Sequence, residues 1–184
     1  MLGAYERIAG ELWMYRRAFL SGCVALIAAM WLVVTPAVAA DFVVEPLDYD
    51  FPDEVSVAAD EDKNIVIMFH QNGCPYCDKM RKRVFPHPKV NAFYSKNFYL
   101  IEVNNKGDLD VVTPTGESMV EKDFAQQMRV RATPVFVFLD KQGNEALKLV
   151  GYQDAEMFNA AGRYVSGEAF KDGTSFLSFV RAGQ

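Results

Sequence analysis

The sequence predicts an α/β fold in which a central mixed sheet is flanked by helices. Apolar runs at 64–69, 98–103 and 135–139 have the composition of buried strands, and helix-like segments separate them. A turn-rich stretch at 140–144 predicts a hairpin that adds an antiparallel strand at 146–150. The expected order of elements is therefore α-β-α-β-α-β-β-α, after an N-terminal signal segment that does not belong to the fold.

Each expected element follows from a local pattern. The run at 64–69 is apolar after its first residue, as a strand covered on both faces is. Pro86 and Pro88 interrupt the helix that follows this strand, so we expect that helix to kink or restart there. The polar stretch 104–117 contains a Thr-Pro-Thr-Gly turn and predicts a small hairpin. Helical composition or spacing predicts helices at 53–63, 78–84, 118–130, 154–165 and 175–180.

Residues 1–40 have the layout of a secretory signal peptide. Two consecutive arginines precede an apolar run at 18–34, and the small residues 37–40 form an A-x-A-like cleavage site. Met14, just before the arginines, is a candidate for the true start of the chain. Cleavage would deliver the mature protein to an exported, oxidising compartment.

Two other interpretations of this segment stay open. The apolar run could remain as a membrane anchor, because its length is borderline for a spanning helix. The stretch from Arg16 to Leu20 also resembles a twin-arginine export signal, which delivers to the same side. A lipoprotein box ending at Cys23 is a weaker match, since most of the apolar run follows this cysteine. We therefore expect Cys23 to be removed with the signal.

Composition and charge restrict the class of protein. We expect 41–52 to be an extended arm and 53–184 to be one domain, because no repeat or second domain is evident. The chain is 51% apolar and contains 14 Phe and 8 Tyr, enough for a substantial core. Its net charge is −5, and removal of 1–40, with three arginines and two glutamates, makes it more negative by one unit. This balance argues against nucleic acid as a partner.

The sequence Cys74-Pro75-Tyr76-Cys77 lies between a predicted strand and a predicted helix, the context in which a C-x-x-C pair is redox-active. Cys74 would occupy the first turn of the helix, where unpaired backbone N–H groups favour a thiolate. Cys77, one turn later, would lie within reach to resolve a mixed disulfide. Pro75 suits a helix start because its missing N–H costs nothing there.

Other uses of two cysteines fit the sequence less well than redox chemistry does. A zinc site needs four ligands, yet outside 1–40 the sequence offers only these cysteines and two histidines, His70 and His87. Haem attachment needs a histidine directly after the second cysteine, and that residue is Asp78. A structural disulfide across so short a loop would constrain the unfolded chain little. We therefore expect a redox site without bound metal.

Four basic residues follow the motif, and we expect them to form a solvated helix face. A second interpretation is that some of them favour the Cys74 thiolate. They are Lys79, Arg81, Lys82 and Arg83.

On these residues the chain resembles the thioredoxin-fold thiol–disulfide oxidoreductases over 53–184. The resemblance rests on the C-x-x-C motif, on the Ala-Thr-Pro step ending at Pro134, and on Gly151 after the fourth strand. It implies that Pro134 is cis and faces the disulfide, and that Thr133 and Pro134 hold a substrate chain as an added strand. The alternative is that Pro134 merely starts a strand.

Within that family the chain resembles exported, single-domain thioredoxins of the sulfur-oxidation (SoxW-like) type, through residues 68–80, 84–90 and 131–138. This implies a monomeric periplasmic reductase of protein disulfides that receives electrons from a membrane thiol transporter. It implies no dissociable cofactor, only the Cys74–Cys77 redox-active disulfide. Gly73, Pro75 and Tyr76 would shape the active-site surface. A disulfide donor, an isomerase, and a non-enzymatic metal carrier or chaperone are the alternatives.

Several positions depart from the thioredoxin pattern. Met68 replaces the buried aspartate, Gly73 replaces a tryptophan, and the dipeptide between the cysteines is Pro-Tyr rather than Gly-Pro. The proton acceptor for Cys77 is therefore an open question. His70 could stabilise the thiolate as an imidazolium or simply end the strand. Tyr76 could present its ring to substrates or be an ordinary exposed turn residue.

Overall fold

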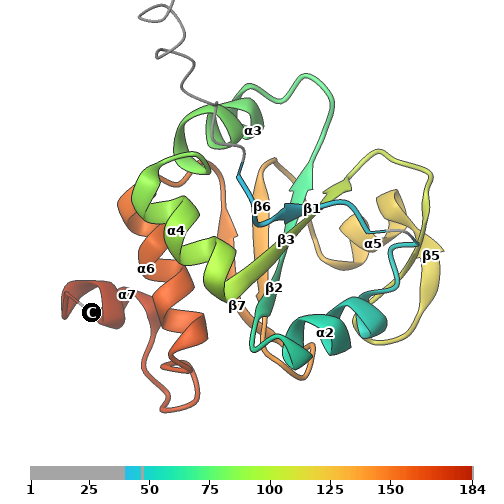
Figure 1. The fold of residues 1–184 in the computed structure, drawn as a ribbon. Coiled ribbons are helices and arrows are strands. Elements are labelled where there is room, and N and C mark those ends of the chain that lie inside the picture. The colour runs from blue at the N-terminus through green and yellow to red at the C-terminus, as the bar shows by residue number, and fades with distance from the viewer. Residues whose placement is uncertain (1–39, 47, 184) are drawn as a thin grey trace, which may run out of the picture. The chain divides into compact units, whose positions relative to one another are not determined.

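The computed structural model describes residues 40–46 and 48–183, and within them the chain forms a five-stranded sheet with helices on both faces (Figure 1). Apart from its last residue, the predicted signal segment 1–40 lies outside the described residues. In the part of the chain that is described, no helix combines the length and apolar character needed to cross a bilayer.

The sheet is mixed, as the sequence predicts. Three strands run parallel in the order β1-β3-β2, and two antiparallel strands, β6 and β7, continue the sheet beyond β2. The strands are β1 (Val43–Val44), β2 (Asn64–His70), β3 (Phe98–Asn104), β6 (Val135–Leu139) and β7 (Glu145–Val150). The predicted fold class, a thioredoxin-type α/β fold with a mixed sheet, is confirmed.

Helices cover the sheet on both sides (Figure 1). On one face lie α4 (Pro88–Asn97) and α6 (Ala155–Ser166), with α7 (Phe176–Arg181) packed against α6. On the other face lie α2 (Phe51–Asp60) and α5 (Glu121–Gln127). At one end of the sheet, α3 (Pro75–Lys79) runs directly into the π-helical segment η1 (Met80–Val84).

Alternation along the strands divides the core into two clusters. In β2, Val66 and Met68 belong to the cluster that contains both cysteines of the motif, whereas Ile67 and Phe69 belong to the cluster under α2 and α5. All four side chains are fully buried, which explains why this strand is a continuous apolar run. Burial of each side chain of this size stabilises the fold by roughly 1.5–3 kcal/mol relative to exposure.

The predicted arm at 41–52 is part of the fold. Val43 and Val44 pair with Leu100 and Ile101 of β3 as a short parallel edge strand. Helix α2 begins at Phe51, two residues earlier than predicted, because the Asp50 carboxylate accepts the Asp53 N–H at 3.2 Å and caps the helix.

The hairpin predicted within 104–117 is present but extends further along the chain. Its strands are β4 (Asp110–Val112) and β5 (Ser118–Val120), paired antiparallel. The predicted helix at 118–130 is therefore shorter, since its first three residues belong to β5 and α5 begins at Glu121. These three residues form a strand because their backbone groups pair with β4, and the helical composition of the segment does not indicate this pairing.

The helix after the motif ends in a π turn. The Phe85 N–H donates to the Met80 carbonyl five residues earlier, at 3.0 Å. The chain restarts as α4 at Pro88, as the two prolines predict. The segment carrying the second cysteine of the motif is therefore one short continuous helical unit that widens in its last turn.

Candidate active site

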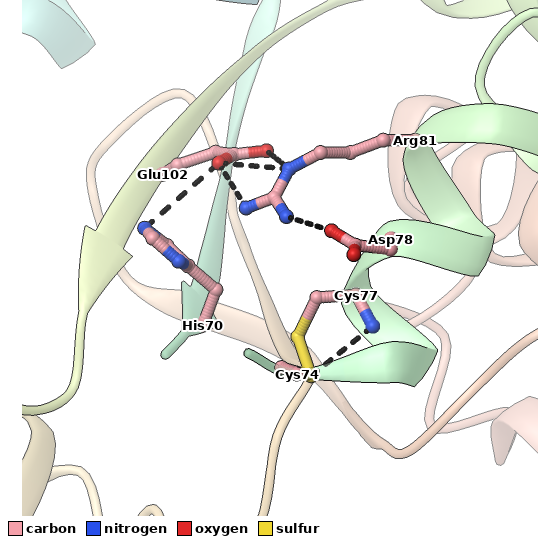
Figure 2. Close-up of a disulfide and its surroundings, with 6 residues drawn as sticks. All are labelled: His70, Cys74, Cys77, Asp78, Arg81 and Glu102. Atoms are coloured by element: carbon pink, nitrogen blue, oxygen red, sulfur yellow. Dashed lines mark hydrogen bonds and ion pairs between the residues drawn. A yellow bond between two sulfur atoms is a disulfide. The ribbon is translucent and has the colours of Figure 1, made fainter. Parts of the chain in front are cut away.

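The C-x-x-C motif forms a disulfide where β2 gives way to α3 (Figure 2). Cys74 is the N-cap of α3, with extended backbone, and its Sγ accepts the Cys77 N–H at 3.1 Å. Cys77 lies one turn into the helix, and the two Cα atoms are 5.3 Å apart. The strand–turn–helix context expected from the sequence is therefore observed.

The two sulfur-bearing residues differ in their access to solvent. Cys74 retains 4% of its surface, whereas Cys77 is fully buried. Both pack into the cluster that also contains Met68, Met80 and Val84. An incoming reactant can therefore reach the pair only from the Cys74 side.

The residues around the cysteines form the exposed rim of the site. Gly73 has φ +72°, a conformation that suits glycine and turns the chain from β2 into α3. Pro75 occupies the first turn of α3, and Tyr76 beside it is 56% exposed, high for a large aromatic side chain. The sequence-predicted surface residues Gly73, Pro75 and Tyr76 are all exposed.

Thr133 and Pro134 lie at the same end of the sheet as the motif. The register pairs Val135 with Phe69, so Pro134 comes just before β6 and beside the end of β2. The Thr133–Pro134 peptide bond is cis. The Pro134 carbonyl accepts the N–H of Gly151, whose φ of +85° suits glycine, at 2.8 Å.

A cluster of charged side chains beside the disulfide was not predicted (Figure 2). Arg81 of η1 donates through Nε and Nη2 to both Glu102 oxygens, with N···O distances of 2.6–3.2 Å. Its Nη1 donates to Asp78 at 3.2 Å. His70 Nε2 lies 3.9 Å from Glu102 Oε2. The pair with Glu102 raises the pKa of Arg81 above its usual value.

The position of Glu102 follows from the sheet register. It pairs with Met68 across β2 and β3, so it lies on the face that carries the cysteines. A carboxylate in the otherwise apolar run 98–103 was the available signal in the sequence, since buried charges require partners.

The surroundings of His70 favour its neutral form. Burial lowers the pKa of this imidazole, and the Arg81 guanidinium also lowers it, while the Glu102 carboxylate raises it less than burial lowers it. The lowered pKa of His70 disfavours an imidazolium beside the disulfide at pH 7. Its backbone carbonyl accepts the Asn105 N–H at 2.8 Å, which ties the end of β2 to the end of β3.

The basic residues after the motif divide into two groups. Lys82 and Arg83 are exposed, as a solvated helix face predicts. Arg81 instead turns inward to Glu102, and Lys79 lies over the Tyr152 ring at 4.0 Å. Across residues 40–46 and 48–183, no group of three or more histidine, cysteine, aspartate or glutamate side chains is placed to hold a metal ion.

The sheet order, the helices on both faces and the C-x-x-C disulfide at the strand–helix junction define a thiol–disulfide oxidoreductase of thioredoxin fold. The family model described as "Thioredoxin-like domain" matches residues 51–166, and the chain belongs to this family. No curated protein matches the chain.

Solved structures share the fold at low sequence identity. A thioredoxin-fold protein from Helicobacter pylori is 21% identical, with 77% of this chain and 84% of that chain covered and a TM-score of 0.55. A thioredoxin from Thermus thermophilus is 25% identical, with 72% of this chain and 94% of that chain covered and a TM-score of 0.54. These similarities show that the described domain has the thioredoxin architecture.

Proposed function

We propose that this protein is an exported reductase of protein disulfides, of the SoxW-like kind. One observation carries the reductive mechanism. Cys74 is the more accessible cysteine, and its sulfur already accepts a backbone N–H at the start of α3, where a thiolate would be stabilised. Cys77 is fully buried behind it and is suited to the resolving step.

The proposed reaction is two thiol–disulfide exchanges. The Cys74 thiolate attacks one sulfur of a substrate disulfide, so the substrate S–S bond breaks and a Cys74–substrate disulfide forms. Cys77 then loses its proton and attacks Cys74 Sγ, which releases the second substrate thiolate and forms the Cys74–Cys77 disulfide. Two electrons pass to the substrate, and its two thiolates take up the protons that the protein dithiol releases.

The substrate chain would lie across the end of the sheet. Thr133 and Pro134 are beside the carboxyl end of β2, where an extended peptide would pair with the Thr133 backbone as an added strand. The exposed Tyr76 ring lies two residues after Cys74 in sequence and would offer an apolar contact for that peptide. Gly73 and Pro75, the two sequence neighbours of Cys74, would shape the surface around that cysteine.

Export and the electron supply complete the proposal. The layout of residues 1–40 supports secretion to the periplasm, where a membrane thiol transporter would reduce the Cys74–Cys77 disulfide after each turnover. The cysteine pair itself carries the electrons, so no dissociable cofactor is required.

Trapping tests the reductive mechanism directly. With Cys77→Ser, the attack by Cys74 proceeds but resolution cannot, so we expect mixed disulfides with substrate proteins that resolve on addition of dithiothreitol. The matched variant Cys74→Ser should trap none, because Cys77 is buried. If Cys77→Ser traps nothing and each substitution instead abolishes Zn²⁺ binding, the protein is a metal carrier.

The reduction potential tests the direction of electron flow. A value near roughly −270 mV, that of thioredoxin, supports a reductase. A value near roughly −120 mV, that of a strong periplasmic oxidant, would make the protein a disulfide donor and overturn the proposal.

A further inference from the structure

A cleft of about 750 Å³ opens at the side chains of His70, Arg81 and Glu102. Its walls include Val44, His70 and Asn104, the last residues of the three parallel strands β1, β2 and β3. In open α/β sheets this edge, outside the carboxyl ends of parallel strands, is where ligands bind. His70, Arg81 and Glu102 line the cleft and also belong to the charged cluster beside Cys74 and Cys77 (Figure 2), so an occupant would contact that cluster.

The cleft carries an excess of negative charge. Four of its lining residues are acidic, and two of these are paired: Glu102 with Arg81, and Asp108 with Lys122. The other two are Glu45 and Glu121.

The side chain of Tyr49 also lines the cleft. Burial raises the pKa of its phenol, and the carboxylates of Glu121, Glu45 and Glu102 raise it further, in that order.

Glu121 is the central feature of the cleft. It begins α5 and is only 3% exposed, which is unusual for a carboxylate. Its Oε1 accepts the Asn104 N–H at 2.7 Å, but its Oε2 accepts no hydrogen bond from any residue that the structure describes. Gly107 makes room for this oxygen, since a Cβ there would come within 1.7 Å of Oε2. This oxygen is still accessible to solvent, so it can accept a hydrogen bond from an occupant of the cleft.

We propose that this cleft binds a lysine or arginine side chain of the substrate protein, close to the cysteine that reacts with Cys74. The proposal rests on the proposed function. The basic head group would donate to Glu121 and approach Glu45. The methylene stem would contact Val43, Val44 and Leu109, the last of which is 58% exposed in the cleft wall. The protein would therefore prefer disulfides that are flanked by basic residues.

Three synthetic peptides test this preference. Each contains one intramolecular disulfide in the same sequence, flanked by two lysines, two glutamines or two glutamates. The rate constant for oxidation of the reduced full-length protein by each peptide is divided by the rate constant for the same peptide with dithiothreitol, which removes differences in intrinsic reactivity. We expect a lysine-to-glutamate ratio on the order of ten at low ionic strength, falling as salt is added.

Substitutions that remove one carboxylate charge test whether the cleft causes the preference for lysine-flanked disulfides. Glu121→Gln keeps the acceptor for the Asn104 N–H and removes the charge, so the ratio should fall at least several-fold. Glu145→Gln removes the same charge from β7, at the opposite edge of the sheet, and should leave the ratio unchanged. If Glu121→Gln does not fold, Glu45→Gln tests the same ratio at an exposed position.

The outcomes separate this inference from the proposed function. The inference would be overturned if the normalised rates for the lysine and glutamate peptides were equal. It would also be overturned if the lysine-to-glutamate ratio were unchanged in both Glu121→Gln and Glu45→Gln. In either case, reduction of the glutamine peptide would still uphold a reductase. Failure to reduce any peptide would overturn both. Strong inhibition by free 1,5-diaminopentane, without selectivity among the peptides, would overturn the proposal that the cleft binds a side chain of the substrate protein. The cleft would then be assigned to a small organic cation.

Discussion

Replacing Glu102 with Gln tests whether the charged cluster holds the disulfide helix in place. The carboxylate receives three N···O contacts of 2.6–3.2 Å from Arg81, which lies on η1, the continuation of the helix carrying Cys77. The substitution keeps the shape of the side chain and removes its charge. Arg81 then loses the charge of its principal partner and one of the two oxygens that accept from it, and it keeps the contact to Asp78.

The structure sets the expected magnitude. Hydrogen bonds to charged groups contribute about 1.5–3 kcal/mol when well shielded. The Arg81 and Glu102 side chains are 33% and 21% exposed, so solvent screening reduces this value. We expect Glu102→Gln to lower the free energy of unfolding by about 1–2 kcal/mol, which for a domain of this size lowers Tm by about 5 °C.

Denaturant titration and NMR are the assays. Asp78→Asn is the matched control: Asp78 is 55% exposed and makes one contact with Arg81, so the expected loss is below about 0.5 kcal/mol. Glu102→Gln should also lower the pKa of His70 further, because Glu102 is the strongest influence that raises it. Equal losses for the two variants, or a His70 titration that does not move, would refute the reasoning.

Three further variants test other contacts. His70→Gln should flatten the pH dependence of Tm. The pKa of buried His70 lies below its ordinary 6.5, so the unfolded chain takes up a proton first and the wild-type protein loses stability as pH falls below about 6.5. A Tm difference between wild type and variant that stays constant from pH 7.5 to 5.5 would contradict this. Tyr94→Phe should cost about 1–2 kcal/mol in chemical denaturation, because the buried hydroxyl donates to the Phe158 carbonyl at 2.6 Å. Gly162→Ala should cost about 1 kcal/mol despite better helix propensity, since the new Cβ would lie 2.7 Å from Phe93 Cε1; a more stable variant would show that this ring yields freely.

Most of the sheet and the position of the cysteines could be predicted from the sequence because both depend on local pattern. Strand β2 is apolar on both faces, and the C-x-x-C motif follows it within a few residues. Strand β1 could not be predicted in this way, because two residues give no periodicity and its pairing with β3 depends on the finished sheet. The same holds for β5, whose residues have helical composition but pair with β4.

The charged part of the site could not be predicted for a different reason. Contact between Arg81 and Glu102 joins residues 21 positions apart. It depends on the register that pairs Glu102 with Met68, and Arg81 lies in the π-helical segment that begins at Met80. Neither is encoded in a short motif. The acidic cleft likewise depends on Glu121, which only the tertiary fold brings to the end of β3.

The local side-chain charges do not favour a thiolate at the disulfide. Arg81 carries one positive charge, but its partners Glu102 and Asp78 carry two negative ones (Figure 2), and the lowered pKa of His70 disfavours an imidazolium at pH 7. Stabilisation of a Cys74 thiolate therefore depends on the backbone N–H groups at the start of α3, of which that of Cys77 already points at the sulfur. The hydrogen bonds of Arg81 with Glu102 instead join the helical segment after the disulfide to β3.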